Sequence, residues 1–205
     1  MSKFFNSLWF RCISVLLVIS VVLGGILAIA NDVLNVTPEE RRSRAIKKIY
    51  EVEIPEEDIK TIIDVDVVEY NKPEDYGSMG KITKLYIVGN EESGKFDYLF
   101  QTTGGEGYKG GTITLWVQVN VDNGNMSIGK IVQESYEKQT LMSKITDAFY
   151  ANFQDTIDGR TYVSSNAIDG QEANIVSGAT YSAQAGCNAI NCVVKYVQEN
   201  LRGAK

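Results

Sequence analysis

The 205-residue sequence contains no histidine and only three cysteines. The lack of histidine excludes histidine-based acid–base catalysis and histidine metal ligands. Cys12 lies in an apolar segment, whereas Cys187 and Cys192 fall on one predicted helix, about 140° apart around its axis, which prevents a bond between them. No Cys-x-x-Cys pair occurs, so an iron–sulfur cluster held by this chain alone is not expected. We therefore predict no metal site and assign the three cysteines to packing.

Basic residues are also in the minority, with 20 Lys and Arg against 26 Asp and Glu and a formal net charge of −6. An acidic chain lacks the electropositive surface that nucleic acids require, so we predict no nucleic-acid partner. The length suits one ordinary domain with an appendage.

A long apolar run stands near the N-terminus. Cys12 to Ala30 carries no charge over 19 residues, which is long enough for a helix to span a bilayer. Because Ala28-Ile-Ala30 resembles a signal-peptidase site, the run is either a cleaved export signal or an uncleaved anchor. It is longer than a usual signal core and has no lipoprotein cysteine at its end, so we favour a single-span anchor over residues 1–31.

The charges that flank this run bear on its orientation. Lys3 and Arg11 precede it, and a larger basic group follows it: Arg41, Arg42, Arg44, Lys47 and Lys48. Because basic residues concentrate on the cytoplasmic side of a span, this count predicts a cytoplasmic C-terminal domain.

The segment 32–79 reads as a helical stalk and a connecting segment. Thr37-Pro-Glu-Glu40 combines an N-cap, a proline at the first helical position and an acidic residue in a capping-box position. We predict a charged helix from there to about Tyr50, which serves either as a solvated stalk or as a contact surface for neighbouring membrane subunits. A short strand is expected at Ile62–Tyr70.

The chain becomes rich in strand patterns beyond residue 80. Strands are predicted at 84–88, 96–101, 112–121 and 127–134, with turns at Glu92–Gly94 and Asn123-Gly124. The third of these alternates, with one apolar face made by Ile113, Leu115, Val117, Val119 and Val121. Trp116 falls on the opposite, polar face, where we expect it beneath a covering helix, a ligand or partner contact being the alternative.

Two helices and one further strand are predicted in the C-terminal part. One amphipathic helix is expected within 138–154, with one face made by Leu141, Ile145, Phe149 and Phe153. A short strand is expected at 160–163. The last helix has apolar residues at helical spacing: Ile190, Val193, Val194, Val197 and Leu201. The fold class is therefore α+β, a transmembrane helix followed by one domain with an antiparallel sheet flanked by helices.

A glycine-dense segment, Gly104-Gly-Glu-Gly-Tyr-Lys-Gly-Gly111, separates two of the strands. Glycine gathers where the backbone turns sharply or approaches another group closely. The segment is not a dinucleotide-binding fingerprint, because no strand–helix unit accompanies it in the required order.

The stretch from Asn174 to Ser182 reads as the start of the last helix. Ser177 is a suitable N-cap, and Gly178 and Ala179 leave the backbone accessible. Thr180 then lies in the first turn, where unpaired N–H groups and the helix dipole favour an anion. The stretch is either a helix cap alone or a place where a phosphate group is held.

Ser177-Gly-Ala-Thr180 resembles the attachment motif of the FMN-binding domain family. That family includes the G subunit of the Rnf ferredoxin:NAD oxidoreductase and the C subunit of the Nqr sodium-pumping quinone reductase. The resemblance implies that a flavin transferase esterifies the phosphate of FMN to Thr180. The family usually has aspartate where Asn174 stands. The domain would cover residues 80–205, and the length and single span are more similar to the Rnf G subunit.

Two other segments take part in the resemblance. Gly104, Gly105 and Tyr108 belong to a segment similar to the family's glycine-rich loop, which lies close to the flavin. The segment 137–145 is similar to a family motif of the form Glu-Thr-Pro-Gly-Leu-Gly followed by Lys-Ile. The residues that match are Glu137, Leu141, Lys144 and Ile145. The motif's Thr, Pro and two Gly are replaced by Lys138, Gln139, Thr140 and Met142. The replacements imply an altered loop, with a wider pocket or a ring held differently. The cofactor-binding residues implied are Thr180, as the covalent attachment, with Asn174, Ser177, Gly178, Ala179, Ser182, Gly104, Gly105, Tyr108, Glu137, Leu141 and Lys144.

The implied function is electron relay through covalent FMN, in a single-pass membrane subunit of an Rnf-type ion-translocating complex. Such a subunit works with other membrane subunits and is not catalytic alone. The family places the flavin domain outside the cytoplasm, opposite to the prediction from the basic residues. The alternatives are a stand-alone exported flavoprotein that passes electrons to an extracellular acceptor, an Nqr-type subunit, and an adhesion or scaffold domain without flavin.

Overall fold

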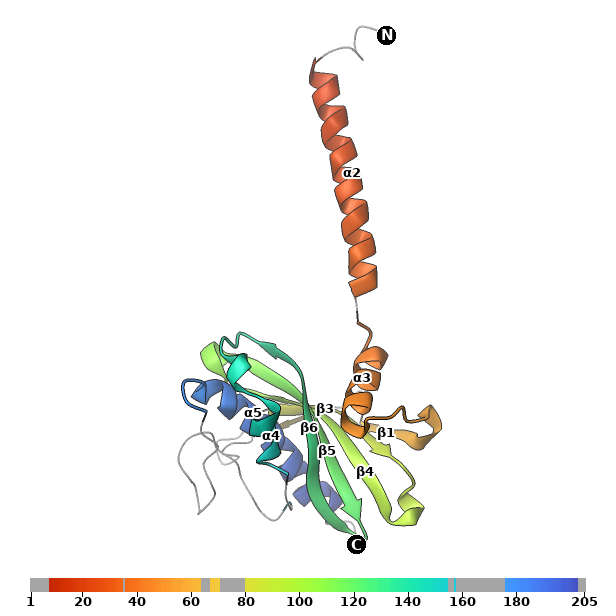
Figure 1. Cartoon of the computed structure of the whole chain (residues 1–205), viewed down its shortest axis with the longest axis vertical. Helices are drawn as coiled ribbons and strands as arrows, with labels where there is room; N and C mark the ends of the chain where they lie inside the picture. Colours follow the sequence, from red (N-terminus) through yellow and green to blue (C-terminus); the bar gives the residue numbers. More distant parts are fainter. Residues whose placement is uncertain are drawn as a thin grey trace. The chain divides into compact units, whose positions relative to one another are not determined.

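The computed structural model describes residues 8–34, 36–63, 67–70, 80–154, 157 and 176–202. The chain forms two compact units, Met1–Arg42 and Ser43–Lys205. The helices (Figure 1) are α2 Leu8–Leu34, α3 Pro38–Tyr50, α4 Asp147–Ala151 and α5 Thr180–Tyr196, the last continued by a π-helical turn at Val197–Leu201. The strands are β1 Ile59–Ile63, β2 Val68–Tyr70, β3 Gly80–Val88, β4 Lys95–Gly104, β5 Thr112–Asp122 and β6 Asn125–Glu137.

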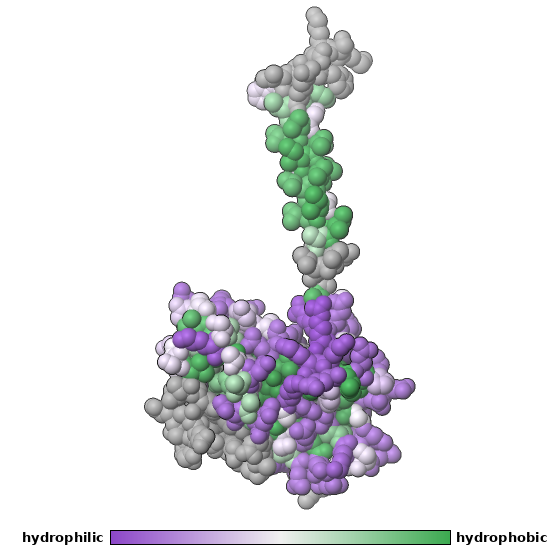
Figure 2. All heavy atoms as spheres, in the orientation of Figure 1, coloured by the Kyte–Doolittle hydropathy of each residue, from purple (hydrophilic) through white to green (hydrophobic). Residues whose placement is uncertain are grey.

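The N-terminal unit is dominated by α2, whose segment Cys12–Ala30 is long and apolar enough to cross a membrane. Its large apolar side chains are exposed along the helix, and Figure 2 shows the apolar surface of its middle part. Such a surface is stable in lipid and not in water, which agrees with a membrane helix. After α2, the hydroxyl of Thr37 accepts a hydrogen bond of 3.2 Å from the backbone N–H of Glu40, so the predicted N-cap of α3 is confirmed.

The second unit is built on one antiparallel sheet in the order β1-β3-β4-β5-β6, with β2 also paired to β3. The predicted alternation of β5 is confirmed, since its five apolar residues are buried on one face. Asn123 and Gly124, at φ of 51° and 85°, form the predicted tight turn between β5 and β6. The sheet therefore follows closely from the strand and turn patterns of the sequence.

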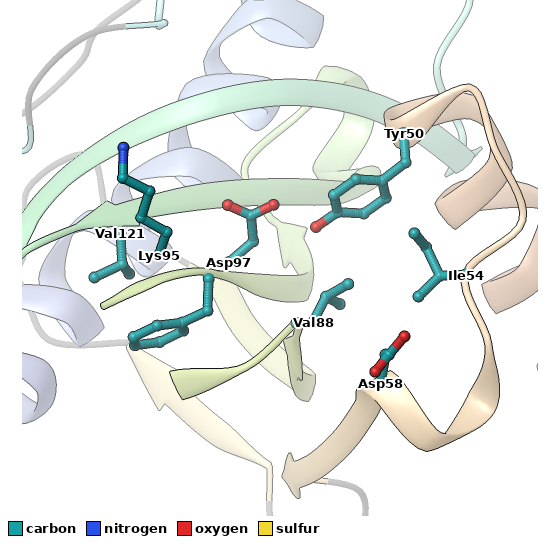
Figure 3. Close-up of a pocket in the computed structure, with 9 residues that line it drawn as sticks. Tyr50, Ile54, Asp58, Val88, Lys95, Asp97 and Val121 are labelled. Carbon is teal, nitrogen blue, oxygen red and sulfur yellow. The ribbon is translucent and has the colours of Figure 1, made fainter. Parts of the chain in front are cut away.

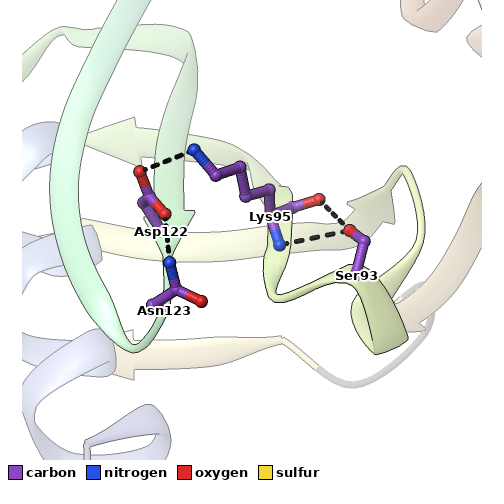
Figure 4. Close-up of polar contacts among 4 residues, drawn as sticks. All are labelled: Ser93, Lys95, Asp122 and Asn123. Carbon is purple, nitrogen blue, oxygen red and sulfur yellow. Dashed lines mark hydrogen bonds and ion pairs between the residues drawn. The ribbon is translucent and has the colours of Figure 1, made fainter.

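Two turns lie side by side at the end of the sheet where β4 begins (Figure 4). The ammonium of Lys95 pairs with the carboxylate of Asp122 at 3.1 Å, and the backbone N–H of Asn123 donates to the carbonyl of Gly94 at 2.8 Å. The hydroxyl of Ser93 donates to the carbonyl of Lys95 at 2.8 Å. These contacts fix the register of the two hairpins, so the glycine-dense segment emerges at the opposite end of β4.

The main core lies between the sheet and α5. It contains alternate residues of β3, β4 and β5 and most of one side of the helix, including Leu85, Phe100, Val117, Ile190 and Val193. Cys187 and Cys192 are buried in this core and form no disulfide, so their predicted packing role is confirmed. Helix α5 crosses the sheet as the sequence pattern indicates, and this places its first turn at one edge of the core.

A second core lies on the other face of the sheet, and it corrects one expectation and confirms another. The second half of α3 is not a solvated stalk, because Ala45, Ile46 and Ile49 pack on the sheet. Trp116 lies 1% exposed in the same cluster, so the expectation of a covering helix is confirmed. The other members are Tyr86, Val88, Leu99 and Val132.

The boundary of the folded unit is also earlier than residue 80. The strand expected at 62–70 is two strands, β1 and β2, and both pair with β3. Because those pairings and the α3 contacts are part of the same layered structure, the compact unit begins at Ser43. The helix expected within 138–154 is likewise shorter, a 3-10 turn at Met142–Lys144 followed by α4.

The backbone explains why that helix is not continuous. Lys138 has a φ of 54° and Thr146 is extended, so neither residue continues a helix. Ile145, Phe149 and Phe153 are buried as expected, whereas Leu141 is 40% exposed. The strand expected at 160–163 lies outside the described residues.

The buried thiols and phenols of the core predict a loss of stability in alkali. Burial raises the pKa of Cys192 from 9.0 to about 12, and burial also raises the pKa values of Cys187 and Tyr150. These groups stay protonated in the folded state after they ionise in the unfolded chain, so stability that is complete below about pH 9 declines towards pH 12. Urea midpoints at about pH 8 and about pH 11 test this, and the higher pH should give the lower midpoint. Equal midpoints would contradict the burial of the thiols.

Candidate functional site

The candidate site is organised around the N-terminus of α5. Thr180 is the first residue of this 17-residue helix, and its side chain is exposed. The N-cap is Ala179 and not Ser177, and no side chain makes a capping hydrogen bond there. Ser177 does not cap because the helix starts three residues after it, with Gly178 at φ of 76° in the intervening turn. The N-cap residue of α5 therefore offers no side-chain acceptor to the first N–H groups of the helix, which favours an anion there.

The glycine-dense segment lies directly against α5. A methyl group at Gly104 would overlap the carbonyl oxygen of Ala185 and the backbone nitrogen of Ala189. The side-chain amide of Asn188 donates a hydrogen bond of 3.0 Å to the carbonyl of Gly105. The C-terminal end of β4 is therefore held against the second and third turns of α5.

The next part of the segment is a compact loop. The N–H of Gly107 donates to the carbonyl of Gly111 at 2.9 Å, and a 3-10 turn covers Tyr108–Gly110. Glu106 and Lys109 have φ values of 60° and 52°, a conformation that is uncommon for residues other than glycine. The loop is thus tightly turned back towards β5, and Tyr108 is half-buried on it.

The segment that follows β6 reaches the same place. The ammonium of Lys144 donates a hydrogen bond of 2.8 Å to the carbonyl of Ser177, and it lies 2.7 Å from where a Cβ of Gly178 would be. Glu137 has an exposed side chain, and its carbonyl faces Gly111 so closely that a methyl group there would overlap it. This loop is therefore in contact with both of the other candidate segments.

Gln139 joins the three segments, and the sequence analysis did not identify it as a site residue. Its side-chain oxygen accepts a hydrogen bond from the N–H of Tyr108 at 3.1 Å and another from the hydroxyl of Ser182 at 2.7 Å. Gln139 is 8% exposed. No periodicity or motif of the sequence marks it, because its partners are 31 and 43 residues away.

The structure thus brings together most of the predicted site residues. Those at the junction are Gly104, Gly105, Tyr108, Glu137, Lys144, Ser177, Gly178, Ala179, Thr180 and Ser182. Leu141 lies on the same loop, with part of its apolar side chain exposed. Asn174 lies outside the described residues. Residues from three parts of the chain therefore converge on one helix end.

The electrostatics of the junction favour a negative group. The N-terminus of α5 is the positive end of its helix dipole, and the ammonium of Lys144 bonds to the carbonyl of Ser177, three residues before the helix begins. Thr180 offers an accessible hydroxyl there, and Tyr181 next to it is 66% exposed. The arrangement is suited to holding a phosphate ester close to an exposed aromatic side chain.

Two cavities of about 380 Å³ lie elsewhere, on the side of the sheet that α3 covers. Tyr50, Asp97 and Lys95 are among the residues that line one of them, and the hydroxyl of Tyr50 points towards the Asp97 carboxylate (Figure 3). Burial, followed by the charge of Asp97, raises the pKa of Tyr50. Neither cavity is lined by a candidate residue of the α5 junction.

Comparison with known proteins does not assign a family: no protein-family model matches the chain, and no curated protein matches it. Among the described residues, no group of three or more Asp, Glu or Cys side chains is placed to hold a metal ion. The likeness to the FMN-binding domain family therefore depends on the three sequence segments described above.

Proposed function

We propose that this protein is a membrane-anchored flavoprotein subunit that relays electrons through FMN bound covalently to Thr180. We further propose that it works within an Rnf-type ion-translocating ferredoxin:NAD oxidoreductase. The observation that supports this most is the convergence of the three resembling segments at the start of α5, where Lys144 and Gln139 contact the Ser177–Ser182 turn.

The residues at this junction fit a phosphate ester of threonine. The Thr180 hydroxyl is exposed, so a flavin transferase has access to it. Once it is esterified, the phosphate keeps a negative charge, which the α5 N-terminus and the Lys144 ammonium both stabilise. The lack of a side chain at Gly178 leaves room for Lys144, because a Cβ there would lie 2.7 Å from its nitrogen.

Two exposed apolar side chains, one next to Thr180 in sequence and one on the loop 137–142, offer surface for contact with a planar ring. Tyr181 is 66% exposed and Leu141 is 40% exposed, although both are large apolar residues of a folded domain. Contact with an aromatic ring or with a partner surface would remove this area from water, at about 25 cal/mol for each Å². FMN, when bound, supplies the electron-transfer chemistry, and these residues supply its position and surroundings.

Covalent attachment suits a fixed relay in a membrane assembly. A tethered cofactor does not dissociate, and α2 is long and apolar enough to hold the chain at the membrane, where we propose that partner subunits lie. We place the flavin domain outside the cytoplasm, as the family resemblance implies. The five basic residues after α2 favour the opposite orientation by the positive-inside rule, and protease accessibility distinguishes the two topologies.

Purification from native membranes in mild detergent tests the relay. The protein should co-purify with multi-span membrane subunits, and protease added to the outer side of intact cells or spheroplasts should cleave the folded domain. A flavinylated monomer without partners would instead favour a stand-alone exported flavoprotein. A monomer without flavin would favour an adhesion or scaffold domain, and protection from the protease would contradict the proposed topology.

A further inference from the structure

Gln139 holds a buried position that a peripheral loop residue rarely has. Its side chain is 8% exposed, and one oxygen accepts hydrogen bonds from two groups on different segments. One donor is the backbone N–H of Tyr108, in the glycine-rich loop, and the other is the hydroxyl of Ser182, in the first turn of α5. A single amide therefore links the loop 137–142, the loop 104–111 and the helix.

The glycines opposite Gln139 fit around this amide. A methyl group at Gly107 or at Gly111 would overlap the side-chain nitrogen of Gln139, which is buried and has no hydrogen-bond partner among the residues that the structure describes. Two glycines of the dense segment therefore approach a side chain of this protein. The amide and the glycine loop are matched in shape, and neither could change alone without displacing the other.

The backbone before Gln139 explains how its side chain turns inward. Lys138 has a φ of 54°, in the left-handed region. A proline at position 139, which is the residue of the resembling motif, would disfavour that conformation of Lys138 and would lack an acceptor side chain. The loop is thus held by the two side-chain hydrogen bonds of Gln139, which we call the clamp, and not by the rigid backbone of a proline.

We propose that Gln139 is a positioning residue: it fixes both loops to the first turn of α5, so that the surroundings of Thr180 are assembled before a cofactor attaches. The effect on the cofactor depends on the proposed function, because it requires FMN at Thr180. The clamp itself depends only on the contacts of Gln139 with Tyr108 and Ser182.

Hydrogen exchange of the full-length protein in detergent tests the clamp without any flavin. Gln139→Met keeps the side-chain length and removes the acceptor, so the amide of Tyr108 and the loop 104–111 should exchange roughly tenfold faster, with the β4–β5 core unchanged. Gln139→Glu keeps an acceptor for both donors and should exchange like the wild type. Thr140→Val, at the exposed neighbouring position, is the matched control and should have no effect.

Unchanged exchange at Tyr108 in Gln139→Met would overturn the proposal, and so would a Gln139→Glu variant that behaves like Gln139→Met. If Gln139→Met unfolds the whole domain, the comparison of Gln139→Glu with wild type decides, and a folded, wild-type-like Glu variant supports the clamp.

A second readout uses the flavinylated protein. Gln139→Met should lower the fluorescence anisotropy and the visible circular dichroism of the attached flavin per mole of FMN, because its surroundings are looser, whereas Gln139→Glu should restore the anisotropy. Equal anisotropy in wild type and Gln139→Met would overturn the effect on the cofactor. If wild type carries no FMN while the exchange results hold, the proposed function fails and the clamp does not.

Discussion

Replacing Thr180 by valine should abolish covalent flavin attachment and leave the fold intact. Valine keeps the β-branched shape and removes the only atom that can form the phosphoester. The threonine side chain is exposed and Thr180 is not the N-cap residue of α5, so the change in stability should stay within about 0.5 kcal/mol. The measurement is flavin fluorescence of the denatured protein in a gel, which should fall to background.

Thr140→Val is the control for this experiment, because Thr140 is an exposed threonine on the adjoining loop. It should keep the full fluorescence. If Thr180→Val stays fluorescent under denaturing conditions, the flavin is attached at another residue and the assignment of the site is wrong.

Replacing Gly104 by alanine should destabilise the second unit by about 3 kcal/mol, at the upper end of the cost of overpacking a core. The added methyl group would meet the carbonyl of Ala185 and the nitrogen of Ala189, which are rigid backbone atoms within α5. The helix must therefore move away from β4, and the junction at its N-terminus moves with it. Urea denaturation measures the loss.

Gly186→Ala is a matched control in α5, the helix that a methyl group at Gly104 would meet. A methyl group at Gly186 would lie 3.3 Å from a ring carbon of Phe149, a side chain that has some freedom to shift, and alanine favours helix by about 1 kcal/mol. Its stability should stay within about 1 kcal/mol of wild type. Equal losses for the two variants would show that α5 does not pack closely on Gly104.

Strand patterns predicted the sheet because they are local. The alternation of β5 places its apolar residues on one face whatever the rest of the chain does, and the Asn123-Gly124 turn has a backbone preference of its own. The apolar spacing of α5 is local in the same way. These elements could therefore be placed from the sequence alone.

The role of α3 could not be derived in this way. Its sequence is strongly charged. Ala45, Ile46 and Ile49 are buried against the sheet with Tyr50 partly buried beside them, and the complementary apolar surface is supplied by strands far along the chain. Trp116 indicated that a helix packs on this face, because a tryptophan on the polar face of a strand is stable only when another element buries it. Nothing in the sequence stated which helix would provide it.

The candidate site was predicted as separate segments and not as a junction. Short motifs selected the loop at 104–111 and the turn at 177–180, but their contact depends on the path of the sheet and of α5. Gln139 joins these segments through two long-range hydrogen bonds. In the sequence, position 139 shows only that glutamine replaces the proline of the resembling motif. The N-cap was assigned to Ser177 from its residue type, whereas the helix begins at Thr180.

The measurement that tests the central claim most directly is the mass of the intact protein isolated from its native membranes, followed by fragmentation of the peptide that contains Thr180. We expect a mass above that of the sequence by one FMN less one water, with the addition located on Thr180. An unmodified Thr180 in protein from cells that contain a flavin transferase would contradict the account.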